Sequence, residues 1–308
     1  MSSQSQKDWL TDDLCENQIT LHKIEKRLTT TRTAFQKVEL LQTYKHGMVL
    51  VLDDTIQSAE SDEWIYHESL VHPALLSCPP HGKVAILGGG EGATLREVLR
   101  HSWISEAVMV DIDREVVNFC RKNLKTFHQG AFDDPRAKVV IDDARSWLKN
   151  QPDESFSSVI FDLSEPIEQG PSQLLFTREF FEQIHRVLVT GGTLGMHAGP
   201  VDMGNSTLDE FFPRLIATVA SVFSSIIPMC AHVFSFSDLW TFAVATKNPT
   251  KNSILENVDS LVKERVKGEL RHYDAQCHAH MSNLPKYVRR LLSKDWKIYT
   301  DEAPPSLD

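Results

Sequence analysis

A glycine-rich turn that follows a short apolar run constrains the fold of this chain more than any other feature. Residues 84–87 read Val-Ala-Ile-Leu, and four glycines follow almost at once: Gly88, Gly89, Gly90 and Gly92. A run this short, closed by glycines, predicts a fully buried parallel strand. Apolar residues then recur at helical spacing from Ala93 to His101, with cations in the last turn. The segment therefore predicts a strand, a tight turn and a helix.

A second apolar run, residues 107–110, follows this helix and ends in Asp111. We expect a second buried parallel strand that carries Asp111 at its carboxyl end. Doubly wound folds hold nucleosides in this way, because glycines admit the ligand to the backbone and the acid accepts the ribose hydroxyls. The glycine spacing alone is a weak signal, since it does not spell Gly-x-Gly-x-x-Gly.

Glu91 interrupts the glycines and has two interpretations. It is either a helix-capping carboxylate or a group that faces the ligand. A carboxylate here would repel a pyrophosphate or an amino-acid carboxylate, both of which suit a helix amino end. It would suit a nucleoside whose tail ends in an ammonium group. Decarboxylated S-adenosylmethionine, an adenosyl sulfonium with an aminopropyl tail, is such a molecule.

Three further segments carry polar residues in patterns that are typical of sites. Residues 57–68 include Gln57 and end in Tyr-His-Glu, and residues 142–144 (Asp-Asp-Ala) follow the expected third strand. Residues 162–166 (Asp-Leu-Ser-Glu-Pro) follow the expected fourth strand, so two carboxylates three residues apart can face one cationic centre. Taken alone, each segment also fits a purely structural role. Tyr66 and His67 could be core residues, residue 142 or 143 a helix N-cap, and residues 162–166 a solvated acidic loop.

The run Gly-Gly-Gly-Glu-Gly-Ala-Thr-Leu-Arg-Glu resembles the signature loop of the polyamine aminopropyltransferases, the spermidine and spermine synthase family. The similarity covers roughly residues 36–246, and several motifs fall in the family's order. It implies that Asp162 is the proton acceptor. The implied donor-binding residues are Gln36, Gln57, Gly88, Gly89, Gly90, Glu91, Asp111, Asp143, Ala144 and Pro171. The implied amine-binding residues are Tyr66, His67, Glu91, Glu165 and Ser235.

The chain departs from the family pattern at two places. Glu165 stands where the family usually has Asp, and residues 234–240 read Phe-Ser-Phe-Ser-Asp-Leu-Trp where spermidine synthases have Pro-Thr-Tyr. The latter segment is closer to thermospermine synthases, so spermidine is the expected acceptor, with thermospermine as product. Putrescine and agmatine remain alternatives. A methyltransferase that uses intact S-adenosylmethionine, and an inactive polyamine-binding homologue, are the other hypotheses.

Charge and cysteine content limit the class of protein. The formal net charge is -10, which argues against nucleic acid as a partner and is compatible with cationic substrates. Five scattered cysteines indicate reduced thiols in an intracellular protein, and no apolar span suggests a membrane segment. We expect a cytoplasmic enzyme that uses decarboxylated S-adenosylmethionine as co-substrate, needs no metal and forms a homo-oligomer, a dimer or tetramer.

The expected architecture is α/β. Residues 1–70 should form a small antiparallel β domain, with short β-type runs and a hairpin turn at 45–47. Residues 71–308 should form a Rossmann-like catalytic domain with a seven-stranded methyltransferase-type sheet, completed by an antiparallel pair of strands. Residues 254–270 read as one amphipathic helix, and the tail to residue 308 as a surface arm.

Overall fold

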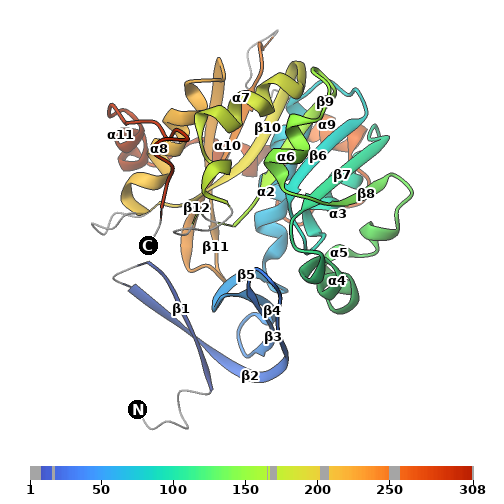
Figure 1. The fold of residues 1–308 in the computed structure, drawn as a ribbon, viewed down its shortest axis with the longest axis vertical. Coiled ribbons are helices and arrows are strands. Elements are labelled where there is room, and N and C mark those ends of the chain that lie inside the picture. The colour runs from blue at the N-terminus through green and yellow to red at the C-terminus, as the bar shows by residue number, and fades with distance from the viewer. Residues whose placement is uncertain are drawn as a thin grey trace.

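The computed structural model describes residues 8–15, 18–164, 166, 172–201, 208–249 and 257–306. Two sheets are stacked along the long axis of the molecule, with the smaller one at the N-terminal end (Figure 1). The smaller sheet has five antiparallel strands in chain order. They are β1 (Trp9–Cys15), β2 (Gln18–Arg32), β3 (Lys37–Thr43), β4 (Gly47–Leu52) and β5 (Thr55–Ala59).

The larger sheet has seven strands in the order β11-β12-β10-β9-β6-β7-β8. The five neighbouring strands from β10 to β8 run parallel. The pairings of β10 with β12 and of β12 with β11 are antiparallel and complete the other edge. The strands are β6 (Lys83–Gly88), β7 (Glu106–Asp111), β8 (Ala137–Ile141), β9 (Phe156–Asp162), β10 (Leu188–Pro200), β11 (Ser225–Val233) and β12 (Asp238–Thr246). The expected fold class is therefore confirmed. The chain order reverses between β6 and β9, which is where open α/β sheets bind ligands.

Helices cover both faces of the larger sheet (Figure 1). One face carries α2 (Glu63–Ser77), α3 (Ala93–Leu99), α9 (Val258–Arg265) and α10 (Ala275–Ser282). The other carries α6 (Ala144–Lys149), α7 (Arg178–Val187), α8 (Leu208–Ala220) and α11 (Lys286–Leu292). Residues of β6 alternate between the two cores, since Val84 and Ile86 face α2 while Ala85 and Leu87 face α7. A strand buried on both faces explains the continuous apolar run at 84–87.

The two sheets are joined by packing around α4 (Arg114–Asn123) and α5 (Lys125–His128). Val38, Leu40 and Leu50 of the small sheet share a core with residues of these two helices. Thr33 also donates a hydrogen bond of 2.6 Å to Asp113, the N-cap of α4. The expected domain boundary at residue 70 lies within α2, and β5 ends eleven residues earlier, at Ala59.

The C-terminal region differs from the expectation. The described part of the segment expected as one helix over 254–270 holds only α9, and Val266 after it is extended. The tail is not a surface arm, because Met281, Leu284, Val288 and Tyr299 are buried in the two cores of the larger domain. Short helices such as α10 and α11 present too few turns for their apolar spacing to stand out.

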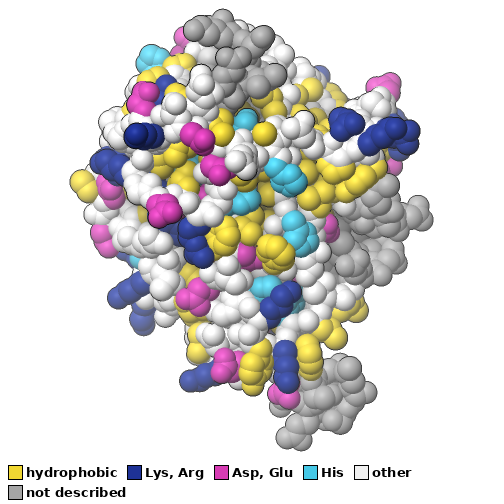
Figure 2. Space-filling view, turned by 180° about the vertical axis from the view of Figure 1, so that it is seen from behind, with side chains coloured by type: hydrophobic (Ala, Val, Ile, Leu, Met, Phe, Trp, Pro, Cys, Tyr) yellow, Lys and Arg dark blue, Asp and Glu magenta, His cyan; other side chains and the backbone are white. Residues whose placement is uncertain are grey.

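Among the described residues, the surface shows no concentration of basic side chains on the face that Figure 2 presents. On the face shown in Figure 2, Lys and Arg side chains are scattered among acidic ones and do not gather into one basic patch. Within the described ranges, no helix combines the length and the apolar character that a membrane crossing requires.

Candidate active site

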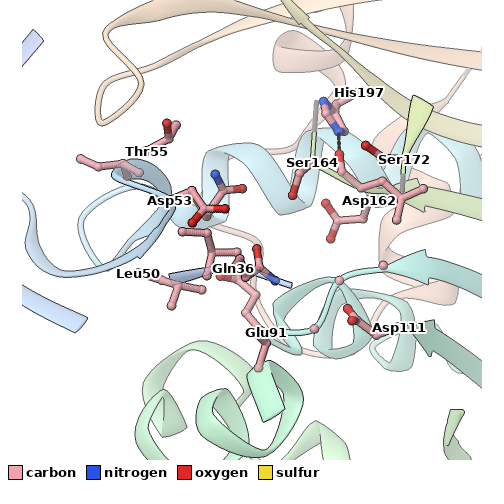
Figure 3. Close-up of a pocket in the computed structure, with 18 of the residues that line it drawn as sticks. Gln36, Leu50, Asp53, Thr55, Glu91, Asp111, Asp162, Ser164, Ser172 and His197 are labelled. Atoms are coloured by element: carbon pink, nitrogen blue, oxygen red, sulfur yellow. Dashed lines mark hydrogen bonds between the residues drawn. The ribbon is translucent and has the colours of Figure 1, made fainter. Parts of the chain in front are cut away.

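A cavity of about 360 Å³ opens at the carboxyl ends of β6, β7 and β9, beside the small sheet. Figure 3 shows Glu91, Asp111 and Asp162 around this hollow. Seven carboxylate side chains line it, and no Lys or Arg does so among the described lining residues. The acids are Asp12, Asp53, Glu91, Asp111, Asp143, Asp162 and Asp238. The lining therefore favours a ligand that carries positive charge.

The glycine loop lies tightly against the ends of its neighbouring strands. Gly88 has a φ of +83°, and a Cβ there would lie 2.0 Å from the carbonyl oxygen of Asp162. At Gly90 a Cβ would lie 2.6 Å from Oδ2 of Asp111. The backbone N–H of Gly89 donates to the carbonyl of Asp162 at 2.9 Å. Side chains at these positions would push the loop away from both acids, so the glycines bring the backbone and the two carboxylates to one place.

Asp162, the last residue of β9, receives two hydroxyl hydrogen bonds. Tyr66 on α2 donates to Oδ1 at 2.7 Å, and Thr94 on α3 donates to Oδ2 at 2.6 Å. Each oxygen thus has one fixed donor, and both donors come from helices on the same face of the sheet. Hydrogen bonds to a carboxylate stabilise its ionised form and fix its plane. Asp162 is held as an oriented acceptor.

Glu91 is paired with His67, which is 2% exposed. Nε2 of His67 lies 2.7 Å from Oε1 of Glu91, and Nδ1 lies 3.0 Å from Oε2 of Glu63. Burial alone would lower the pKa of His67, but the two carboxylates outweigh burial and raise that pKa to about 10. Ser58 on β5 also donates to Oε1 of Glu91, at 3.2 Å. Both ring nitrogens of His67 are therefore engaged by carboxylates.

Asp111 ends β7 and lies behind the glycine loop. Its Oδ1 accepts the backbone N–H of Asp113 at 2.8 Å. Burial, together with the nearby charges of Asp113 and Asp162 and against two opposing backbone hydrogen bonds, raises the pKa of Asp111 to about 6. Gln36 enters from the small sheet, and its amide donates to Asp113 at 3.3 Å. Asp143 lines the same cavity and caps α6 by accepting the N–H of Ser146 at 2.7 Å.

The structure brings most of the expected site residues to this cavity. The residues that line it are Gln36, Gln57, Tyr66, His67, Gly88, Gly89, Gly90, Glu91, Asp111, Asp143, Ala144 and Asp162. Glu165 and Pro171 lie outside the described residues. Ser235 does not reach the cavity: it is 1% exposed, and its backbone N–H donates to Asp62 at 2.7 Å. The β11–β12 turn instead contributes Phe236 to the lining, and the start of β12 contributes Asp238 and Trp240.

Four residues around the site were not predicted from the sequence. Ser58 and Thr94 contact the acids Glu91 and Asp162, and Glu63 and Arg96 lie behind His67. Thr94 and Arg96 lie in the helix that follows the glycines, where only the apolar positions were interpreted. Ser58 is separated from Glu91 by 33 residues and Thr94 from Asp162 by 68. A hydroxyl in the first turn of that helix was a usable signal for Thr94, since this turn faces the ligand edge of the sheet. In the described part of the chain, no cluster of three or more His, Cys, Asp or Glu residues has the geometry of a metal site.

Comparisons with known proteins agree with this geometry. The family model described as "Spermine/spermidine synthase domain" matches residues 63–256, and that described as "Spermidine synthase tetramerisation domain" matches residues 9–60. A polyamine aminopropyltransferase of Sulfurisphaera tokodaii is 41% identical over 285 residues, 92% of each chain. One of Aeropyrum pernix is 40% identical over 95% of this chain and 92% of its own length.

Solved structures give the same result. A spermidine synthase in complex with the transition state analogue AdoDATO has a TM-score of 0.82 at 28% identity, over 92% of this chain and 94% of that chain. Spermidine synthase from Thermotoga maritima has a TM-score of 0.81 at 27% identity, with the same coverage. The fold, the acidic cavity and these similarities together show that the chain is an enzyme that belongs to the polyamine aminopropyltransferase family, the spermidine and spermine synthases.

Proposed function

We propose that this enzyme moves the aminopropyl group of decarboxylated S-adenosylmethionine to a polyamine, with spermidine as the acceptor and thermospermine as the product. The observation that carries the proposal is the cavity lining, in which seven carboxylates face no Lys or Arg among the described residues. Both substrates are cationic, since the donor carries a sulfonium and an ammonium and the acceptor carries several ammonium groups. Such a lining selects them and disfavours intact S-adenosylmethionine, whose carboxylate would meet Glu91.

The donor would occupy the edge of the cavity formed by the glycine loop. Asp111 would accept hydrogen bonds from the ribose hydroxyls. Asp143 would accept one from the amino group of adenine, and the backbone N–H of Ala144 would donate to an adenine ring nitrogen. Glu91 would bind the ammonium of the aminopropyl tail. Gln57 would line the nucleoside pocket, and Gln36 would do so while bonded to Asp113. Glu165 and Pro171 keep the roles that the family resemblance implies, as an amine contact and a donor contact.

The acceptor would approach Asp162 from the side of the β11–β12 turn. Primary amines have pKa values of about 10, so the attacking nitrogen arrives protonated and must lose a proton. Asp162 takes this proton, and the freed nitrogen attacks the carbon bonded to the sulfonium. The C–S bond breaks in line, its electron pair stays on sulfur, and neutral methylthioadenosine leaves. Most of the acceleration comes from alignment, since the leaving group is good and Asp162 is already oriented by Tyr66 and Thr94.

The choice of spermidine rests on the walls of the acceptor end. Phe236 and Trp240 pack against each other with ring centroids 4.6 Å apart, and both line the cavity. Asp238 lies between them in sequence and supplies a carboxylate there. This end can hold the apolar methylenes and the third ammonium group of a triamine, a group that the diamine putrescine lacks.

The match of residues 9–60 to a tetramerisation domain supports a homo-oligomer that assembles through the small sheet. Strand β2 places Ile19, Leu21 and Leu28 on the surface of this sheet, at exposed fractions of 63%, 46% and 41%. Apolar side chains this exposed are typical of interfaces.

The test is incubation with decarboxylated S-adenosylmethionine and a panel of amines, with products identified by mass spectrometry. Thermospermine formed from spermidine is the expected result. Turnover of putrescine or agmatine alone would show that the proposed acceptor, spermidine, is wrong. Methyl transfer from intact S-adenosylmethionine would overturn the proposed reaction. Amine binding without release of methylthioadenosine would indicate an inactive homologue.

A further inference from the structure

A row of buried groups with alternating charge leads from Glu91 away from the cavity. His67 stands between Glu91 and Glu63, as described above, and Arg96 stands behind Glu63. Nη1 and Nη2 of Arg96 lie 3.0 and 2.8 Å from Oε1 and Oε2 of Glu63. None of these four side chains is more than 9% exposed. The row joins the loop after β6 to α2 and α3.

Arg96 holds Glu63 in a geometry that leaves little freedom. The contact is bidentate, so it fixes the plane of the carboxylate as well as its distance. The third guanidinium nitrogen, Nε, lies 2.7 Å from Glu97, and Nη1 also donates to the carbonyl of Phe127. Arg96 is therefore anchored on two sides, and Glu63 presents Oε2 to His67 from a fixed position.

His67 can donate a hydrogen bond to Glu91 only while both its ring nitrogens carry protons. Its Nδ1 lies 2.6 Å from the backbone carbonyl of Glu63, which accepts only from an N–H. A neutral ring would keep its proton at Nδ1 for this carbonyl, and the lone pair on Nε2 would then face the carboxylate of Glu91. The charged groups that face the ring are Glu63 on its own helix and Glu91 on the loop. The anchored charge of Glu63 thus keeps the ring doubly protonated.

The bonds to His67 and Ser58 both use Oε1 of Glu91. Among the contacts that the described residues make, Oε2 is the oxygen left for a ligand. We propose that Glu63 and Arg96 are positioning residues, which hold His67 so that His67 turns Oε2 of Glu91 towards the ammonium of the aminopropyl donor. The proposal rests on the proposed function, in which Glu91 receives that ammonium. It also gives His67 a role through Glu91 rather than as a direct contact to the amine.

The experiment compares two ligands that differ by the tail. Decarboxylated S-adenosylmethionine carries the aminopropyl group, whereas methylthioadenosine fills only the nucleoside pocket. In Glu63→Gln the ring should lose its second proton at lower pH, so affinity for the tailed ligand should fall between pH 6 and 8.5. We expect a loss of about tenfold at pH 8.5, equivalent to one charge-assisted hydrogen bond. Calorimetry should show unchanged affinity for methylthioadenosine.

Glu97→Gln is the matched control. Glu97 is also buried and binds the same arginine, but its other oxygen lies 3.0 Å from Nε2 of His72 and not against His67. Its replacement should lower the stability of the protein. The preference for decarboxylated S-adenosylmethionine over methylthioadenosine should stay unchanged at every pH. The inference fails if Glu63→Gln keeps the wild-type preference at pH 8.5, or if Glu97→Gln loses it to the same extent.

Glu91→Gln separates this inference from the proposed function. If Glu91→Gln does not reduce the preference for the tailed ligand, the proposed donor site is wrong. If it does and Glu63→Gln does not, only the positioning role is wrong. Should Glu63→Gln not fold, nitrogen NMR of the wild-type protein gives the answer. Protons on both ring nitrogens of His67 at pH 8.5 support the inference, and a neutral ring overturns it.

Discussion

Removal of the hydroxyl of Thr94 tests the proposed chemistry directly, because this hydroxyl contacts the proposed base, Asp162. Thr94 is fully buried, and its Oγ1 donates to Oδ2 of Asp162 at 2.6 Å. Thr94→Val removes this donor and keeps the shape of the side chain, while Tyr66 still holds Oδ1. A hydrogen bond to a charged group contributes about 1.5–3 kcal/mol, and this contribution to holding Asp162 in place would be lost.

The expected effect is a loss of turnover. A free energy of about 1.4 kcal/mol corresponds to a tenfold change in rate, so kcat/KM should fall by about tenfold to a hundredfold. Initial rates of methylthioadenosine release measure this loss. Affinity for methylthioadenosine should not change, because Thr94 does not line the cavity.

Thr94→Ser is the matched control, since it keeps the hydroxyl and removes one methyl group. It should retain wild-type turnover, with a small loss of stability from the cavity left behind. Unchanged turnover in a folded Thr94→Val protein would refute the assigned hydrogen bond. Equal losses of turnover in both variants would show that packing, and not the hydroxyl, controls Asp162.

Three further predictions test other parts of the site. Asp162→Asn should lower turnover by about 10²–10⁴-fold with little change in donor affinity, as seen by product assay and calorimetry; near wild-type turnover would remove the base from the scheme. Because burial raises the pKa of Asp111 to about 6, its ionised form is lost as pH falls through 6. Donor affinity should then drop by up to about tenfold per pH unit, and an identical curve in Asp111→Asn would assign the effect to another group. Asp238→Asn should raise KM for spermidine by about threefold to tenfold and leave KM for putrescine nearly unchanged, whereas an equal rise for both amines would place Asp238 elsewhere than at the distal ammonium.

The parts of the fold that could be predicted are those with a local pattern. Residues 84–87 and 107–110 are strands because both faces of the sheet are covered, which the continuous apolar runs indicate. Parallel strands bring their carboxyl ends to one edge, so Asp111 and Asp162 could be expected near each other. The tail escaped prediction because its buried residues are spread over short helices, each with few apolar positions.

The contacts that orient the acids depend on tertiary structure. Arg96 lies in a helix whose apolar residues already indicate burial. Its neighbours in the sequence do not reveal that it pairs with Glu63, which lies 33 residues earlier. A buried guanidinium needs carboxylate partners, so an Arg inside an apolar helix is a signal that partners exist, though not which ones. Ser235 was misplaced for a related reason, because the side chains of a turn diverge and only some of them face the cavity.

The carboxylate lining has a consequence for the enzyme before any substrate arrives. Among the described lining residues, only the protonated His67 offsets these negative charges, so the carboxylates repel one another and this repulsion opposes the compact state of the empty protein. Polyamines should therefore act as thermal protectants even when the donor is absent, with the gain fading as potassium chloride screens the cavity. The ionic strength of the surroundings would then affect both the association rate of the amine substrate and the thermal stability of the enzyme.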